Sequence, residues 1–185
     1  MPAATPPPTP PVEVIVVYAP RLAPLGGEAA FSAVQVGPEI LKTTPRLDQA
    51  LESAPGVSLF RRTTSLSANP TTQGVSLRAI AGSGAGRALV TLDGAPVNDP
   101  FGGWVIWSAL PSEGLEGATI VRGAGAGPYG AGALTGVINL QERGAREGLG
   151  AMDLSVGERN SYRAAVSGGT PDLLITASGE SNDGY

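Results

Sequence analysis

Glycine is the feature that most limits how this chain can fold. It accounts for 27 of the 185 residues, which is about twice its usual share of roughly 7%. The glycines follow no strict three-residue period, and this excludes a collagen-like triple helix. Because glycine weakens helices and permits tight turns, bulges and close backbone approach, its density favours short strands joined by turns over long helices.

The remaining composition indicates a folded domain and excludes several kinds of chemistry. Hydrophobic residues make up 42% of the chain and charged residues 15%, enough apolar material for one core and part of a second domain. A net charge of −4 lacks the basic surface of a nucleic-acid binder. Cysteine and histidine are both absent, so disulfides, thiolate or imidazole catalysis and the usual zinc sites are excluded.

The start of the chain is extended rather than globular. Residues 2–11 (PAATPPPTPP) contain six prolines, which is typical of a semi-rigid tether and equally of a trimmed start. Residues 12–17 (VEVIVV) then predict a short strand. Met1 is followed by prolines and not by the basic start and apolar core of a signal peptide, so we expect any export signal to lie upstream or to have been removed.

Short strands with few helices are predicted as far as residue 143, an α+β pattern. The best helix is expected at 45–54, with Thr44 as its N-cap, Pro45 at its first position and Pro55-Gly56 at its end. A helical turn is expected at 37–41, and Asp93-Gly94 predicts a tight turn. Strands are predicted at 33–36, 57–60, 75–78, 88–92, 115–121 and 137–140.

The pattern changes to alternating strands after residue 143. Met152, Leu154 and Val156 fall on one face of the first strand, with Asp153 and Ser155 on the other. Two more strands alternate in the same way around residues 161–167 and 174–180, with turns at 158–160 and 168–172. A soluble antiparallel sheet and the first strands of a membrane barrel both give this pattern, and the chain stops close to the third strand.

One glycine motif formally matches a nucleotide-binding loop. Residues 125–130 fit G-x-G-x-x-G, but a dinucleotide site needs a helix to begin there. Pro128 and the glycines that follow are unfavourable for a helix. We therefore expect no nucleotide enzyme, no cofactor and no resident metal.

Two groups of side chains are candidates for binding. Arg78, Arg87 and Arg122 each lie at the end or beginning of a predicted strand, either as surface arginines or as guanidinium groups paired inside a polar enclosure. The second group is aromatic, and its members are either a corner of the core or ligand contacts on a glycine-rich loop: Phe101, Trp104 and Trp107.

Five motifs in this order resemble the plug domain of TonB-dependent outer-membrane receptors across residues 12–142. They are VEVIVVYA (12–19), LDQALESAPGV (47–57), VSLR (75–78), RALVTLDGAPVN (87–98) and the segment from ATIVRG (118–123) to GVINL (136–140). The chain departs from the family pattern at Ala79, where a glycine usually follows the arginine, and at Gly127-Pro128 before Tyr129.

The resemblance implies roles for individual residues. The first segment is similar to the TonB box, which pairs as a strand with the C-terminal domain of TonB: Glu13, Val14, Ile15, Val16 and Val17. The others correspond to the structural motifs of the plug: Pro55, Gly56, Arg78, Arg87, Asp93, Gly94, Arg122, Gly123, Tyr129, Gly130, Gly136 and Asn139.

The resemblance also implies an architecture: an α+β globular plug of short strands and few helices, followed by the start of a truncated antiparallel transmembrane β-barrel, which in the family has about 22 strands. The expected divisions are a proline-rich tether (1–11), the plug (12–143) and incomplete barrel strands (144–185). Met152, Leu154, Val156 and Tyr162 would face lipid, and Asp153, Ser155 and Arg163 the lumen.

The implied function is gating in an active transporter of the outer membrane, with the TonB box facing the periplasm. Such a receptor binds a scarce nutrient complex, for example a ferric siderophore or cobalamin, and imports it with energy from TonB. Two alternatives stay open: a soluble stand-alone binding or signalling module, and a non-functional fragment of a receptor gene.

Overall fold

The structure is a computed structural model that describes most of the chain from residue 31 onward. The described residues are 31–59, 61, 65, 67–69, 73–78, 87–123, 129–130, 132–144 and 150–183. The predicted tether, the TonB-box segment and residues 125–128 of the glycine motif lie outside them.

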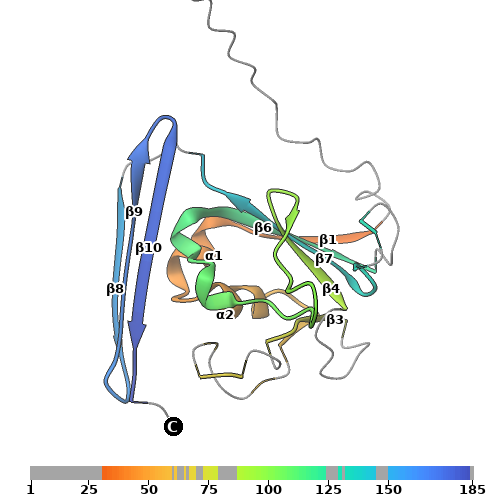
Figure 1. Cartoon of the computed structure of the whole chain (residues 1–185), viewed down its shortest axis with the longest axis horizontal. Coiled ribbons are helices and arrows are strands. Elements are labelled where there is room, and N and C mark those ends of the chain that lie inside the picture. The colour runs from red at the N-terminus through yellow and green to blue at the C-terminus, as the bar shows by residue number, and fades with distance from the viewer. Residues whose placement is uncertain are drawn as a thin grey trace, which may run out of the picture.

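A five-stranded sheet forms the centre of the first part of the chain (Figure 1). Its strands are β1 (Ser32–Val36), β4 (Ala88–Leu92), β5 (Ala95–Pro96), β6 (Leu115–Arg122) and β7 (Gly136–Glu142). Their order is β1-β6-β7-β4-β5, and β4 and β7 are parallel while the other pairs are antiparallel. In this register Ile120 of β6 lies opposite both Val34 and Ile138.

Short helices cover one side of this sheet and complete its core. They are α1 (Pro38–Thr43), α2 (Leu47–Glu52) and the 3-10 turns η3 (Trp107–Ala109) and η4 (Ser112–Gly114), accompanied by a two-stranded sheet of β2 (Val57–Ser58) and β3 (Ser76–Leu77). The core is apolar, and its members include Leu47, Leu51, Leu77, Val90, Trp107, Ile120, Ile138 and Leu140.

The predicted strands of this part are confirmed in position, but the predicted start of the helix at 45–54 is wrong. Thr44 is the C-cap of α1, with φ −108 and ψ 124, because a residue before proline is driven out of the helical region. Helix α2 begins only at Leu47, because Arg46 has an extended backbone with φ −136 and ψ 144; Arg46 is the N-cap and makes no side-chain capping hydrogen bond. The strands expected at 57–60 and 75–78 shorten to two residues each.

The second part of the described chain is a three-stranded antiparallel sheet. Its strands β8 (Ala151–Gly157), β9 (Ser161–Thr170) and β10 (Leu173–Ser181) lie in the order β10-β9-β8. The β8–β9 turn contains Arg159 and Asn160 with positive φ values of 56 and 50, as a type I′ hairpin turn requires. The turn predicted at 168–172 is wrong in length, since Gly168 to Thr170 continue β9 and pair with β10.

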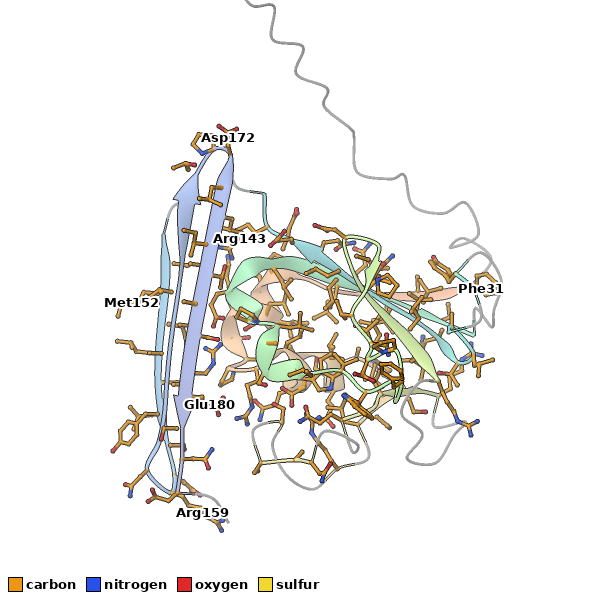
Figure 2. The ribbon with its side chains drawn as sticks, viewed as in Figure 1. Phe31, Arg143, Met152, Arg159, Asp172 and Glu180 are labelled. Carbon is orange, nitrogen blue, oxygen red and sulfur yellow. The ribbon has the colours of Figure 1, made fainter. Side chains whose placement is uncertain are left out.

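One face of this sheet is apolar and exposed. Its large side chains are between 49% and 77% exposed: Met152, Leu154, Val156, Tyr162, Val166, Leu173 and Ile175. Figure 2 shows Met152 pointing away from the five-stranded sheet. Arg163 and Ser167 on the other face of β9 are buried, so the predicted alternation is confirmed. No helix in the described residues has the length and apolarity needed to cross a membrane.

The close approach of β6 and β7 gives a prediction at Gly136. This residue has φ +144, and a Cβ there would lie 2.2 Å from the Val121 carbonyl oxygen. We expect Gly136→Ala to lower the free energy of unfolding by at least about 2–3 kcal/mol, measured by urea denaturation, because both the dihedral angle and the contact are unfavourable.

Gly94→Ala separates the effect of the backbone conformation from the effect of the close contact. Gly94 has φ +87, and a Cβ there would have nothing within 4 Å. Its substitution should cost only about 1–2 kcal/mol, the penalty of the left-handed backbone. Equal losses at the two positions would contradict the contact with Val121.

Candidate functional site

Three predicted motif segments meet at the ends of β3 and β6. Arg122, the last residue of β6, donates from Nη1 to the Pro55 carbonyl oxygen at 2.8 Å and from Nη2 to Ser32 Oγ at 2.6 Å. The backbone N–H of Arg78, which follows β3, donates to the Gly56 carbonyl oxygen at 2.6 Å. We call Pro55, Gly56, Arg78, Arg122 and Gly123 the arginine–glycine corner.

Arg78 lies against Gly123, the residue that follows Arg122 in the chain. Arg122 lies against Gly56, whose carbonyl oxygen accepts from the Arg78 N–H. A Cβ on Gly123 would lie 3.0 Å from Nη1 of Arg78, and a Cβ on Gly56 would lie 3.4 Å from Nη1 of Arg122. Both glycines have positive φ, +77 and +84, so a side chain at either would be strained as well as crowded. The glycines therefore provide the space in which the two guanidinium groups lie.

Arg78 itself has an uncommon backbone conformation, with φ 62. Left-handed backbone in a residue with a side chain costs about 1–2 kcal/mol, and its hydrogen bond to Gly56 helps to hold it. In the described part of the chain, no carboxylate forms an ion pair with Arg78 or Arg122. The Arg122 guanidinium group thus donates to two neutral acceptors, and Arg78 is exposed.

Four other predicted motif residues hold the parallel pair β4–β7. The Asp93 N–H donates to the Leu140 carbonyl oxygen at 2.9 Å, and Asp93 Oδ1 accepts from the Glu142 N–H at 3.2 Å. Asp93 and Gly94 have φ 47 and 87 and form the predicted turn. At the other end, Thr135 donates from its N–H and its hydroxyl to the Arg87 carbonyl oxygen. In the middle, the Thr91 hydroxyl donates to Asn139 Oδ1.

The remaining predicted motif residues lie at the approach to β7. Tyr129 is half-buried, and the Gly130 carbonyl oxygen accepts from the Ala133 N–H at 3.2 Å. Arg87 is exposed, and its described contacts use the backbone rather than the guanidinium group. Of the three arginines, therefore, only Arg122 and Arg78 come together.

The aromatic residues predicted as ligand contacts separate into different environments. Phe101 is 97% exposed, whereas Trp107 is 2% exposed and donates from Nε1 to the Gln73 carbonyl oxygen at 3.1 Å. Trp107 is therefore part of the core, which is one of the two alternatives that the sequence left open for this group. Trp104 is half-buried, with its ring packed over Gly102, so Phe101 is the member best placed to touch a ligand.

Two polar residues that sequence reasoning missed make this loop rigid. Asp99 Oδ1 accepts from the N–H groups of Phe101 and Gly102 at 2.9 and 2.8 Å. Asn98 Oδ1 accepts from the Val90 N–H at 2.7 Å, and its Nδ2 donates to the carbonyl oxygens of Ala88 and Gly103. Their position in NDPFGGW was the available indication, since asparagine and aspartate commonly hydrogen-bond local backbone in turns.

Sequence reasoning also missed the ion pairs that join η4 and the start of α2 to the three-stranded sheet. Arg163 of β9 pairs with Glu113 of η4, and Arg46 pairs with Glu180 of β10. Grooves of about 260 and 140 Å³ lie at this boundary, each lined in part by Arg46, Arg163 and Glu180. In the described residues, no group of three or more acidic side chains is arranged to hold a metal ion.

Residues 28–137 match the family model of the TonB-dependent receptor plug domain, which is more than half of the chain. No curated protein matches the chain. Solved structures of several outer-membrane receptors resemble it in fold.

The ferric citrate transporter FecA superposes with a TM-score of 0.60 at 22% identity, over 83% of this chain and 26% of that one. The alcaligin outer-membrane receptor FauA of Bordetella pertussis gives 0.58 at 20%, over 89% and 28%. The ferric-catecholate import receptor Fiu of E. coli K12 gives 0.58 at 19%, over 82% and 21%.

These likenesses establish fold, and the chain spans only about a quarter of the length of these receptors. The similar structures and the open three-stranded sheet together confirm the predicted α+β plug followed by the first strands of an antiparallel barrel sheet.

The two hydrogen bonds of the Arg122 guanidinium group lead to a prediction about stability. Arg122→Lys keeps the charge, but one ammonium group cannot reproduce the two separate donors that reach Pro55 and Ser32. We expect the free energy of unfolding to fall by about 1 kcal/mol, since both hydrogen bonds are exposed to water. Arg87→Lys is the matched control and should change it by no more than about 0.5 kcal/mol. A similar small change at both positions would show that the fork contributes nothing.

Proposed function

The chain belongs to the TonB-dependent receptor plug family, and we propose that it forms the plug and the first wall strands of an outer-membrane active transporter. The family consists of transport receptors and not of enzymes. The observation that carries the proposal is the plug fold with its motif residues gathered at the arginine–glycine corner and along β4–β7. The proposed divisions are the tether (1–11), the plug (12–143) and the wall strands (144–185).

A chelated metal is the proposed cargo. The names of the structural neighbours refer to ferric citrate, alcaligin and ferric catecholates, and that of another, HasR, refers to a hemophore and heme. We propose a ferric siderophore or a similar complex, with a cobalamin-type ligand as the second choice. The metal would arrive already chelated, and Phe101 on its rigid loop would contact the organic part of the complex.

The arginine–glycine corner is proposed to face the remainder of the barrel. Two neighbouring guanidinium groups whose described acceptors are all neutral have donors left for carboxylates or carbonyl groups. Acceptors lining the lumen would complete the polar enclosure expected for these arginines.

Uptake by the complete gene product tests the transporter proposal. Iron-limited cells that express it should accumulate at least one of radiolabelled ferric citrate, ferric enterobactin, heme and cobalamin. Accumulation should disappear when TonB is deleted. Uptake of none of the four, together with recovery of the protein in the soluble fraction, would favour the stand-alone binding module.

The proposed TonB box (Glu13 to Val17) gives a second test. Val14→Pro and Val16→Pro, made separately, should abolish TonB-dependent uptake and leave ligand binding at the cell surface unchanged, because proline removes a backbone donor needed for strand pairing. Val14→Thr and Val16→Thr keep the donor and a β-branched side chain, so they should transport normally. Normal uptake in both proline variants would place the box elsewhere.

The exposed apolar face of β8 to β10 supports the proposed membrane location. Leu154→Arg should destabilise the folded protein in bilayers by about 2–4 kcal/mol if this position lies near the midplane. Ser178→Arg, at an exposed position on the opposite face of the sheet, is the control and should insert normally. Folding into lipid vesicles, followed by electrophoresis without boiling, measures both. Equal folding of the two variants would argue against a lipid-facing surface.

A further inference from the structure

A bidentate ion pair joins the 3-10 turn η4 to the three-stranded sheet. Arg163 of β9 donates from Nη1 and Nη2 to the two carboxylate oxygens of Glu113 at 2.6 and 2.9 Å, and Nη1 also reaches Asp153 at 3.1 Å. The side chains of Arg163 and Glu113 are only 8% and 11% exposed. This pair is therefore largely removed from water on both sides.

A second connection runs through α2. Arg46, at the N-terminal end of α2, pairs with Glu180 of β10, and these side chains are 17% and 14% exposed. Asp48 in the first turn of α2 lies 4.0 Å from Nε of Arg46 and accepts a hydrogen bond from Arg61. The charges therefore alternate in sign from Arg61 through α2 to the wall strand.

Close packing accompanies these pairs. Element η4 contacts both β9 and β10, and a Cβ on Gly114 would lie 3.5 Å from Cβ of Thr176. In Figure 1 the three-stranded sheet stands beside the end of the five-stranded sheet where α1, α2 and η4 lie, and Figure 2 places Glu180 on this boundary. The ion pairs that reach the three-stranded sheet come from η4 and from the N-terminal end of α2.

We propose that the pairs Glu113–Arg163 and Arg46–Glu180 form a latch that keeps the α2–η4 side of the plug on the barrel wall throughout transport, so that movement is confined to the opposite side. The proposal rests on the proposed function as a transporter. Opening the latch would separate Glu113 and Glu180 from their arginines and leave Arg163 with Asp153 and Arg46 with Asp48 as their remaining acidic neighbours, and breaking largely buried ion pairs in this way is unfavourable. In the described residues of the opposite side, β1 is an edge strand and the hydrogen bonds of the Arg122 guanidinium group are exposed to water, so movement there breaks weaker contacts.

A disulfide across the boundary tests whether this side moves. The chain contains no cysteine, and the distance of 3.5 Å between the Cβ positions of residues 114 and 176 is within the range that a disulfide needs. In the complete gene product, Gly114→Cys with Thr176→Cys should form the bond, detected by the mobility of a protease fragment. Uptake of ferric citrate, ferric enterobactin, heme or cobalamin, whichever the unmodified protein accumulates, should be the same with the bond oxidised or reduced.

The outcomes of this experiment separate the latch from the proposed function. Uptake that stops on oxidation and returns on reduction would overturn the latch. The single variants Gly114→Cys and Thr176→Cys show whether either substitution disturbs uptake by itself. An unmodified protein that accumulates none of the four compounds and is recovered in the soluble fraction would instead overturn the proposed function, and the next measurement then tests only whether Glu113 and Arg163 are coupled.

Exchange of the two charges tests the latch without transport. In the detergent-solubilised gene product, Glu113→Arg and Arg163→Glu should each lower the midpoint of thermal unfolding by about 5–10 °C. The double variant should regain roughly half of the loss, because the new carboxylate at 163 would still be repelled by Asp153. Glu39→Arg with Lys42→Glu, an exposed pair at 3.6 Å, is the matched control and should change the midpoint little. Additive losses in the double variant would overturn the latch.

Discussion

Strand β6 pairs with β1 along one edge and with β7 along the other, and the rest of the described plug depends on this double pairing. It places Ile120 between Val34 and Ile138 in the sheet, where both isoleucines are fully buried. It also sets Arg122 opposite Ser32 and Gly136. The pairing requires that position 136 carry no side chain, since the Val121 carbonyl oxygen would occupy the place of its Cβ. The glycine density of the sequence thus has a specific use here.

The sequence predicted the elements better than the contacts between them. The alternation of Met152, Leu154 and Val156 and the Asp93-Gly94 turn depend on near neighbours, so periodicity and turn chemistry were sufficient. The start of α2 was wrong by two residues: Thr44 and Pro45 suit the first positions of a helix, but Arg46 has an extended backbone and the helix begins only after it. The motif resemblance located the corner arginines, but not which glycine each one would lie against.

Contacts distant in sequence could not be predicted from the residues alone. Arg163 was expected on the lumenal face of its strand, which the pattern of burial supports. Its partner Glu113 lies 50 residues away, and nothing in the local sequence distinguishes Glu113 from the nearby Glu116, which is exposed. Glu113 is the partner because η4 packs against β9 and β10 in the folded chain. Trp107 likewise enters the core because Gln73 supplies a carbonyl group for its indole N–H.

Hydrogen bonds join the loop that carries Phe101 to the five-stranded sheet. Asn98 binds the backbone of β4 at Val90 and Ala88 while it holds Gly103 within the loop. A displacement of Phe101 that kept the internal bonds of Asp99 would therefore have to move β4 or break the Asn98 contacts. Strand β4 is in turn fixed to β7 by the bonds of Arg87, Thr91 and Asp93. A ligand that pressed on this loop would thus act on the β4–β7 pair first.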